Sequence, residues 1–111
     1  MKMKLNDKNI EFNIFDMNHA QRFEDALKEM EKDEKAIQSS LEKFQSGEIG
    51  VAVFLGKNID MFKKFFQTTT GVDVVGDCTD YIKIKKMYDD FLTEIKKDKQ
   101  KFARFSSKRI N

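Results

Sequence analysis

An apolar side chain recurs every three or four residues over two long stretches of this chain, and this spacing constrains the fold more than any other sequence feature. Such spacing places the apolar side chains on one narrow face of an α-helix. The chain contains no proline, so both helices can continue without a break. We therefore predict a first long helix that ends at Gly47 and a last long helix over residues 79–102. The apolar positions are Ala20, Phe23, Leu27, Met30, Ile37, Leu41 and Phe44 in the first helix, and Tyr81, Ile84, Tyr88, Phe91, Ile95 and Phe102 in the last.

One acidic residue interrupts each apolar stripe, Glu34 in the first helix and Asp98 in the last. A buried, unpaired carboxylate is costly, so each must reach solvent, meet a basic partner or mark a helix break. A break around residues 32–34 is the alternative to a continuous first helix. Replacing Asp98 with Leu extends the apolar stripe and is expected to raise thermal stability.

The remaining elements follow from turn and cap signals. Residues 1–15 are expected to form a β-hairpin, because turn-forming residues precede an alternation of apolar and polar side chains. The first helix begins either at Asp16 as N-cap or at Asn18, which has capping-box spacing to Gln21. Residues 49–55 have strand composition, but the spacing that follows favours a helix over residues 49–67 that is weakened near Gly56.

These elements predict an α+β fold that is mainly α. An N-terminal β-hairpin is followed by about three helices, two of them long and heptad-like. The chain forms a single domain, residues 1–111, with the hairpin at 1–15, a helical body at 16–103 and a basic tail at 104–111. Ser106 and Ser107 are expected to end the last helix.

The stretch "TTTGVDVVGDC", residues 68–78, has the glycine spacing of a phosphate-binding loop. In such a loop a lysine and a hydroxyl residue follow the second glycine, whereas Asp77 and Cys78 stand there in this chain. We interpret the stretch as a connector between helices, with Asp77 or Thr79 as the N-cap of the last helix.

No catalytic constellation is recognisable. His19 is the single histidine and Cys78 the single cysteine, so neither has a partner for nucleophilic catalysis or for a cysteine-based zinc site. We therefore expect no enzymatic activity, no metal and no cofactor. The longest purely apolar run, "VAVFL", is too short to cross a membrane, and no membrane partner is expected.

Basic residues gather at the C-terminal end. Residues 96–111 carry seven basic side chains and one acidic side chain, interleaved with aromatic residues. Such a tail either complements the end of a helix or binds an anionic partner such as nucleic acid, whose backbone contacts make affinity salt-dependent. The candidate anion-binding residues are Lys97, Lys99, Lys101, Arg104, Lys108 and Arg109.

Three pieces of the chain carry a resemblance to a known family: "FDMNHAQRFEDAL" after the hairpin, "FFQTTTGVDVVGD" before "YDDFLTEI", and the ending "FARFSSKR". In order, they resemble small uncharacterised proteins encoded in the tail-gene cassettes of siphophages and prophages of Firmicutes. The resemblance implies an acidic N-cap after the hairpin, a double-Phe helix end before a glycine-containing connector, and an aromatic–serine–basic tail.

The resemblance also implies a function, because that family is encoded near the tape-measure gene, a place often held by tail assembly chaperones. The expected role is a non-enzymatic phage morphogenesis protein of the host cytoplasm that binds the helical tape-measure protein or another tail protein. The matching apolar stripes of the two long helices further suggest that these helices pack antiparallel to each other or that the protein self-associates. The alternative is a small nucleic-acid-binding or regulatory phage protein, including an inhibitor of a host defence system, that acts through the basic end. The partner-binding surface is expected on the apolar residues Leu55, Ile59, Phe62, Phe66, Tyr88, Phe91 and Ile95.

Overall fold

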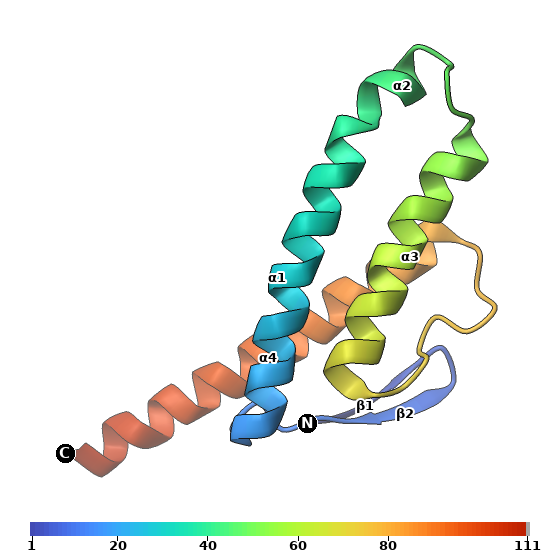
Figure 1. Ribbon diagram of the computed structural model, residues 1–111. Coiled ribbons are helices and arrows are strands. Elements are labelled where there is room, and N and C mark those ends of the chain that lie inside the picture. The colour runs from blue at the N-terminus through green and yellow to red at the C-terminus, as the bar shows by residue number, and fades with distance from the viewer. Residues whose placement is uncertain (111) are drawn as a thin grey trace.

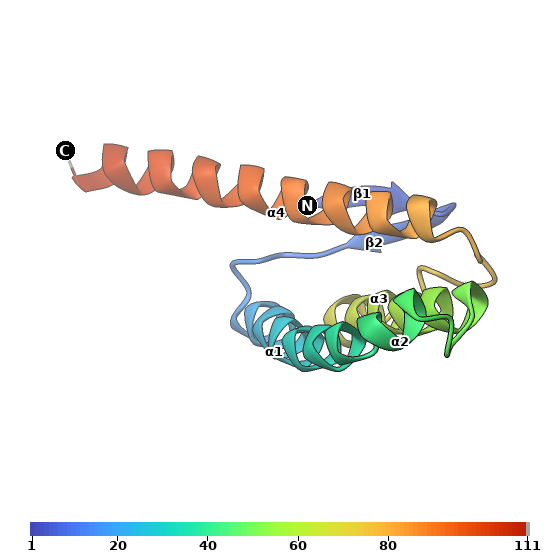
Figure 2. The same ribbon diagram turned by 90° about the horizontal axis from the view of Figure 1, so that it is seen from above.

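The computed structural model describes the backbone of residues 1–110 and the side chains of residues 1–105. The chain forms two layers, a helical hairpin in one and a β-hairpin beside a long helix in the other (Figures 1 and 2). The elements are β1 (Lys2–Leu5), β2 (Lys8–Glu11), α1 (Met17–Ser39), α2 (Leu41–Gln45), α3 (Val51–Thr70) and α4 (Tyr81–Ile110). The predicted fold class, mainly helical with an N-terminal β-hairpin, is confirmed.

The β-hairpin turns at Asn6 and Asp7, which both adopt left-handed backbone conformations with φ of 50° and 62°. Two consecutive residues of this kind match the twist of an antiparallel strand pair. The strands pair with Met3 opposite Ile10, so alternate side chains face the helices. Leu5, Ile10 and Phe12 are consequently buried, whereas Lys4, Asn9 and Glu11 are exposed on the opposite face.

Of the two predicted N-caps of the first helix, Asp16 and Asn18, the structure has Asp16 as the N-cap of α1. The Asp16 Oδ1 atom accepts hydrogen bonds from the backbone N–H groups of Asn18 at 2.9 Å and His19 at 3.2 Å. These two bonds, the one from His19 foremost, favour the carboxylate and lower the pKa of Asp16 below the ordinary value of an aspartate. The capping box on Asn18 is therefore not the start of the helix.

The prediction that the first helix continues to Gly47 is wrong, because α1 ends at Ser39 and the short helix α2 follows. The hydroxyls of Ser39 and Ser40 both donate to the carbonyl oxygen of Ala36, at 2.7 Å and 3.2 Å. Such side-chain bonds compete with the helical hydrogen-bond ladder and favour its end. The alternative break at residues 32–34 does not occur, and Glu34 lies exposed on a continuous helix.

Helix α3 resolves the ambiguity at residues 49–55 in favour of helix. It begins at Val51, continues through Gly56 and ends three residues later than predicted, at Thr70. Gly71 follows in a left-handed conformation with φ of 73°, which is the usual glycine C-cap. Helix α1 packs chiefly along α3 as an antiparallel hairpin rather than along α4 (Figure 1).

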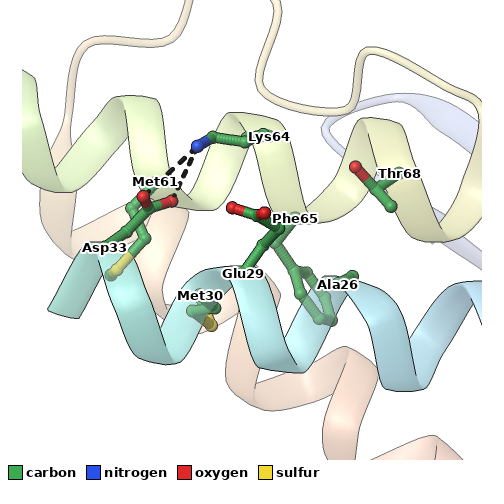
Figure 3. A pocket seen from close by; sticks show the side chains of 8 residues that line it. All are labelled: Ala26, Glu29, Met30, Asp33, Met61, Lys64, Phe65 and Thr68. Carbon is green, nitrogen blue, oxygen red and sulfur yellow. Dashed lines mark hydrogen bonds and ion pairs between the residues drawn. The ribbon is translucent and has the colours of Figure 1, made fainter.

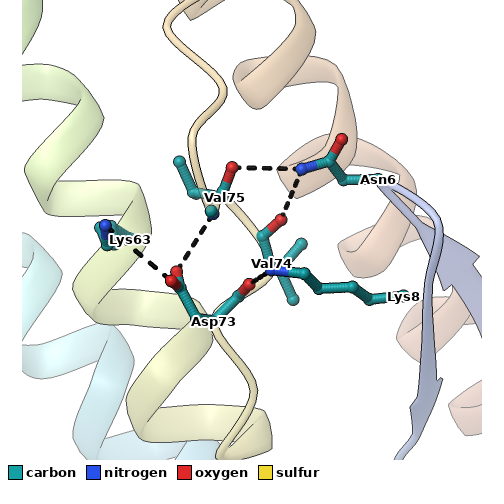
Figure 4. Close-up of polar contacts among 7 residues, drawn as sticks. Asn6, Lys8, Lys63, Asp73, Val74 and Val75 are labelled. Atoms are coloured by element: carbon teal, nitrogen blue, oxygen red, sulfur yellow. Dashed lines mark hydrogen bonds and ion pairs between the residues drawn. The ribbon is translucent and has the colours of Figure 1, made fainter.

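The segment between α3 and α4 is a connector held by the β-hairpin (Figure 4). The Asn6 side-chain amide donates to the carbonyl oxygens of Val74 at 2.9 Å and Val75 at 3.1 Å. Lys8 donates to the carbonyl oxygen of Asp73. The turn of the hairpin thus satisfies backbone groups of a loop whose Val74 and Val75 side chains are buried, and this anchors the connector.

Helix α4 begins at Tyr81 with Asp80 as its cap, since the Asp80 carboxylate accepts the backbone N–H groups of Ile82 and Lys83 at 3.0 and 3.3 Å. Neither predicted cap, Asp77 or Thr79, has this role. The helix continues to Ile110, so the prediction that Ser106 and Ser107 end it is wrong, and residues 104–110 are helical rather than an extended tail. Beyond Asp98 every described side chain is exposed, and we call residues 99–110 the α4 overhang.

Asp98 meets a basic partner. Its carboxylate lies 3.6 Å from the N-terminal ammonium of Met1, which also donates to the carbonyl oxygen of Phe12 at 2.5 Å. The Met1 side chain is 4% exposed and the Asp98 side chain 21% exposed. Position 98 therefore belongs to a partly buried ion pair that fixes the start of the hairpin to α4, and the expected stabilisation by leucine there needs revision.

We now expect Asp98→Leu to lower the free energy of unfolding by about 1–3 kcal/mol, because it leaves the partly buried ammonium of Met1 without its carboxylate. The control is Asp90→Leu on the same helix. Asp90 pairs with Lys86 at an exposed site, so its loss should change stability by less than about 1 kcal/mol. Chemical denaturation of both variants measures the difference, and equal effects would contradict a structural role for the ion pair.

Two adjacent threonines at the end of α3 test the hydrogen bonding of the core. Thr69 is buried, and its hydroxyl has no partner among the described residues. The Thr70 hydroxyl donates to the carbonyl oxygen of Phe66 at 2.7 Å and accepts from the N–H of Val72 at 3.1 Å. We expect Thr69→Val to raise the free energy of unfolding by about 1 kcal/mol and Thr70→Val to lower it by a similar amount. A shift of the same sign in both variants would refute these assignments.

Candidate partner-binding site

The seam between α1 and α3 is closed by packing and by one ion pair (Figure 3). Met30 and Phe65 are buried there, and Lys64 lies 3.0 Å from the Asp33 carboxylate above them. The hydrogen bond to Asp33 raises the pKa of Lys64, so the lysine holds its charge throughout the neutral range. This arrangement joins the two helices and provides no chemistry of its own.

The residues expected to bind a partner lie largely inside the chain's own core. Phe62, Phe66, Phe91 and Ile95 are buried, and Phe66 and Phe91 are both 0% exposed. Tyr88 is half-buried, its ring lying 5.0 Å from those of Phe62 and Phe65, and burial is the main cause of its raised pKa. Leu55 and Ile59 are also half-buried. The helical periodicity of these residues is real, but it marks the core, so the seven residues do not form an accessible docking surface.

The two residues with reactive side chains have structural surroundings. The Nδ1 atom of His19 accepts the backbone N–H of Asn13 at 3.0 Å, and its ring stacks on Phe12 at 5.3 Å. Cys78 is half-buried in the connector before α4. Within the described residues no group of three or more His, Cys, Asp or Glu side chains is placed to hold a metal ion. In the same part of the chain no helix is both long and apolar enough to cross a membrane.

Several large apolar side chains are exposed among the described residues. They are Phe15, Met17, Val51, Val53, Ile82, Phe102 and Phe105. At the tip of the helical hairpin, Phe44 of α2 and Phe54 of α3 stack at 4.5 Å, and Val51 and Val53 are exposed nearby in sequence. At the other end, Phe15 stacks on Phe102 at 4.6 Å where α4 leaves the body.

The cluster formed by Phe15 and Phe102 continues along the α4 overhang. Phe105 follows Phe102 by one helical turn, and the two rings are 56% and 50% exposed. We call Phe15, Phe102 and Phe105 the aromatic patch. Figures 1 and 2 both show α4 projecting beyond the two layers, and the molecule reaches 60 Å in its longest dimension. The fold thus presents half-exposed aromatic side chains on a helix that projects from the body.

The candidate anion-binding residues share this helix. Lys97, Lys99, Lys101 and Arg104 are exposed, and Lys97 pairs with Glu94 at 3.2 Å. The Lys99 ammonium lies 5.9 Å from the centre of the Phe23 ring and therefore turns toward the body. Lys108 and Arg109 belong to the same helix, but their side chains lie outside the described residues.

The family comparison covers nearly the whole chain. Residues 6–110 match the model of a family described as a family of unknown function (DUF6673). The chain belongs to this family. The matched segment begins in the turn of the β-hairpin and ends with α4, so it includes both the anchored connector and the overhang. Neither the search of curated proteins nor the search of solved structures found a match.

Sequence reasoning missed the aromatic patch of this family member, although one signal was available. Phe15 does not follow the alternation of Ile10, Phe12 and Ile14. Its large side chain therefore points away from the buried face of the hairpin and could have been predicted to be exposed. Its partner Phe102 was assigned to the apolar seam of the last helix, and only the three-dimensional arrangement shows that the body ends before it.

The difference between the buried apolar residues of α3 and α4 and the exposed aromatic patch can be measured by truncating one phenylalanine of each set and comparing stabilities. Phe66→Ala is expected to lower the free energy of unfolding by about 3–5 kcal/mol, because it opens a cavity in the core. Phe105→Ala is expected to change it by less than about 1 kcal/mol, because its ring is more than half exposed. Urea denaturation monitored by circular dichroism compares the two variants. A small loss of stability in Phe66→Ala would indicate that Phe66 and its neighbours are accessible to a partner after all.

Proposed function

We propose that this protein is a non-enzymatic binding protein for a helical protein partner, and specifically a tail assembly chaperone that holds the tape-measure protein of a siphophage or prophage in the host cytoplasm. The observation that carries the binding role is the aromatic patch on the α4 overhang. Each Phe ring that a partner buries there contributes up to about 1.5–3 kcal/mol, scaled by how much of it was exposed.

The shape of the overhang favours a helical partner. It is a helix of about 18 Å whose first turn meets the body through Phe102 and Lys99 and whose remainder projects past both layers, so a second helix can lie along it at the usual 8–10 Å between axes (Figure 2). Recognition of this kind places apolar residues three or four positions apart against a facing stripe. A tape-measure protein, as a long α-helical chain with apolar stripes, supplies such residues repeatedly.

The surroundings of the reactive residues agree with a binding role. His19 uses its ring to hold the junction between β2 and α1, and Cys78 lies in a connector that is anchored through its backbone. The resemblance to proteins of tail-gene cassettes supports the particular choice of the tape-measure protein. The chaperone role follows from that choice, because apolar stripes of an unassembled helical chain aggregate unless another protein covers them.

Co-expression tests the proposal. A helical fragment of the tape-measure protein encoded near this gene is produced alone, with the full chain, and with an unrelated helical protein of similar size. We expect the soluble share of the fragment to rise several-fold when it is produced with this protein, and not when it is produced alone or with the unrelated protein. The two chains should also elute together in size-exclusion chromatography. A fragment that is equally soluble in all three conditions refutes the chaperone function.

A further inference from the structure

The C-terminal part of α4 carries a basic stripe beside the aromatic patch, and this stripe begins at Lys97, which pairs with Glu94, and runs into the overhang. Lys97, Lys101 and Arg104 are spaced four and three residues apart, so they lie along one face of the helix. Phe102 and Phe105 are spaced three apart and lie on a neighbouring face. A ligand that lies along this helix would meet both an apolar strip and a row of cations.

The charge of the stripe is not balanced locally. Residues 96–111 carry seven basic side chains and one acidic side chain, which leaves 14 basic and 18 acidic side chains in residues 1–95. The one acid, Asp98, is occupied by the N-terminal ammonium of Met1. Lys101 and Arg104 take part in none of the ion pairs found among the described residues. The overhang is therefore a positive helix attached to a negative body.

We propose that the basic stripe and the aromatic patch together form the docking site for an acidic amphipathic helix. The apolar ridge of that helix covers Phe102 and Phe105, and carboxylates beside the ridge pair with Lys101 and Arg104. The inference rests on the proposed function for the choice of a helical protein and adds the surface and the charge of the partner. Complementary charge selects the partner and its orientation, and aromatic burial supplies affinity.

Other surfaces and occupants fit these observations less well. The tip of the helical hairpin has exposed valines, but its charges alternate, with Glu42 beside Lys43 and Glu48 before Lys57, so they favour no partner. A second copy docking overhang to overhang would bring two positive helices together. Single-stranded nucleic acid needs free ring faces for base stacking, whereas Phe15 and Phe102 each cover one face of the other.

Peptide binding to the full chain tests this proposal. One labelled peptide of about 21 residues has leucine at the a and d heptad positions and glutamate beside them, and a second has lysine in place of glutamate. A single-stranded oligonucleotide of about 20 thymidines is the third probe. We expect the glutamate peptide to bind at least about tenfold more tightly than the lysine peptide at roughly 0.1 M salt.

Charge reversal locates the site. Lys101→Glu with Arg104→Glu is expected to weaken binding of the glutamate peptide at least about tenfold, whereas Lys43→Glu with Lys57→Glu at the hairpin tip makes the same change in net charge and should leave it within about twofold. Phe105→Ala should weaken binding and Val53→Ala should not. Circular dichroism verifies that the variants fold, as expected for exposed side chains.

Three results would overturn the docking site: no preference between the peptides, equal affinity in both charge-reversal pairs, or tighter binding of the oligonucleotide than of the glutamate peptide. Concentration-dependent self-association that the Lys101 and Arg104 changes abolish would assign the stripe to a second copy instead. The proposed function fails separately. If the Lys101 and Arg104 variant solubilises the tape-measure fragment as well as the wild type, the chaperone stands and this site falls. If the glutamate peptide binds as expected but no fragment is solubilised, the docking site stands and the chaperone function falls.

Discussion

Four phenylalanine rings, one from each main part of the fold, contact one another in a closed cycle. Phe12 of the β-hairpin meets Phe23 of α1 at 6.3 Å, Phe23 meets Phe65 of α3 at 6.2 Å, Phe65 meets Phe91 of α4 at 6.1 Å, and Phe91 returns to Phe12 at 5.5 Å. All four contacts are edge-on, the geometry that the ring quadrupole favours. Both layers depend on this cluster, because it is where the β-hairpin and α4 are joined to the helical hairpin.

The core lies around the four rings, and the tip of the helical hairpin and the C-terminal end of α4 both extend beyond it. The helical hairpin continues to the Phe44–Phe54 stack, and α4 continues past Ile95 in the other layer, so the molecule is longer than its core. Burial of α4 ends near the ion pair between Asp98 and the Met1 ammonium. The same geometry that stabilises the centre therefore exposes apolar residues at the ends, where a partner can reach them.

Much of the fold could be predicted from the sequence, because helix periodicity and the alternation of the β-hairpin are local properties. The fold class and the Asp16 cap are examples. What failed depends on long-range contacts or on small competing bonds. Periodicity cannot say whether a stripe such as Phe62–Phe66 faces its own chain or a partner, and it could not show that Asp98 faces a terminal ammonium. The break at Ser40 depends on hydroxyl bonds whose strength is close to that of the helical ladder.

The placement of basic residues around the aromatic patch opposes contact between the overhangs of two copies of this chain. Exposed rings on a projecting helix would pair readily with the same rings of another copy. The lysines and arginine on the adjoining faces oppose that contact, since two overhangs that approach each other bring many cations together and few acids. In the proposed docking site the same cations attract a carboxylate-rich ligand. Under that proposal a single arrangement of side chains discourages contact between two copies and favours a partner of opposite charge, and this selectivity does not require a preformed pocket.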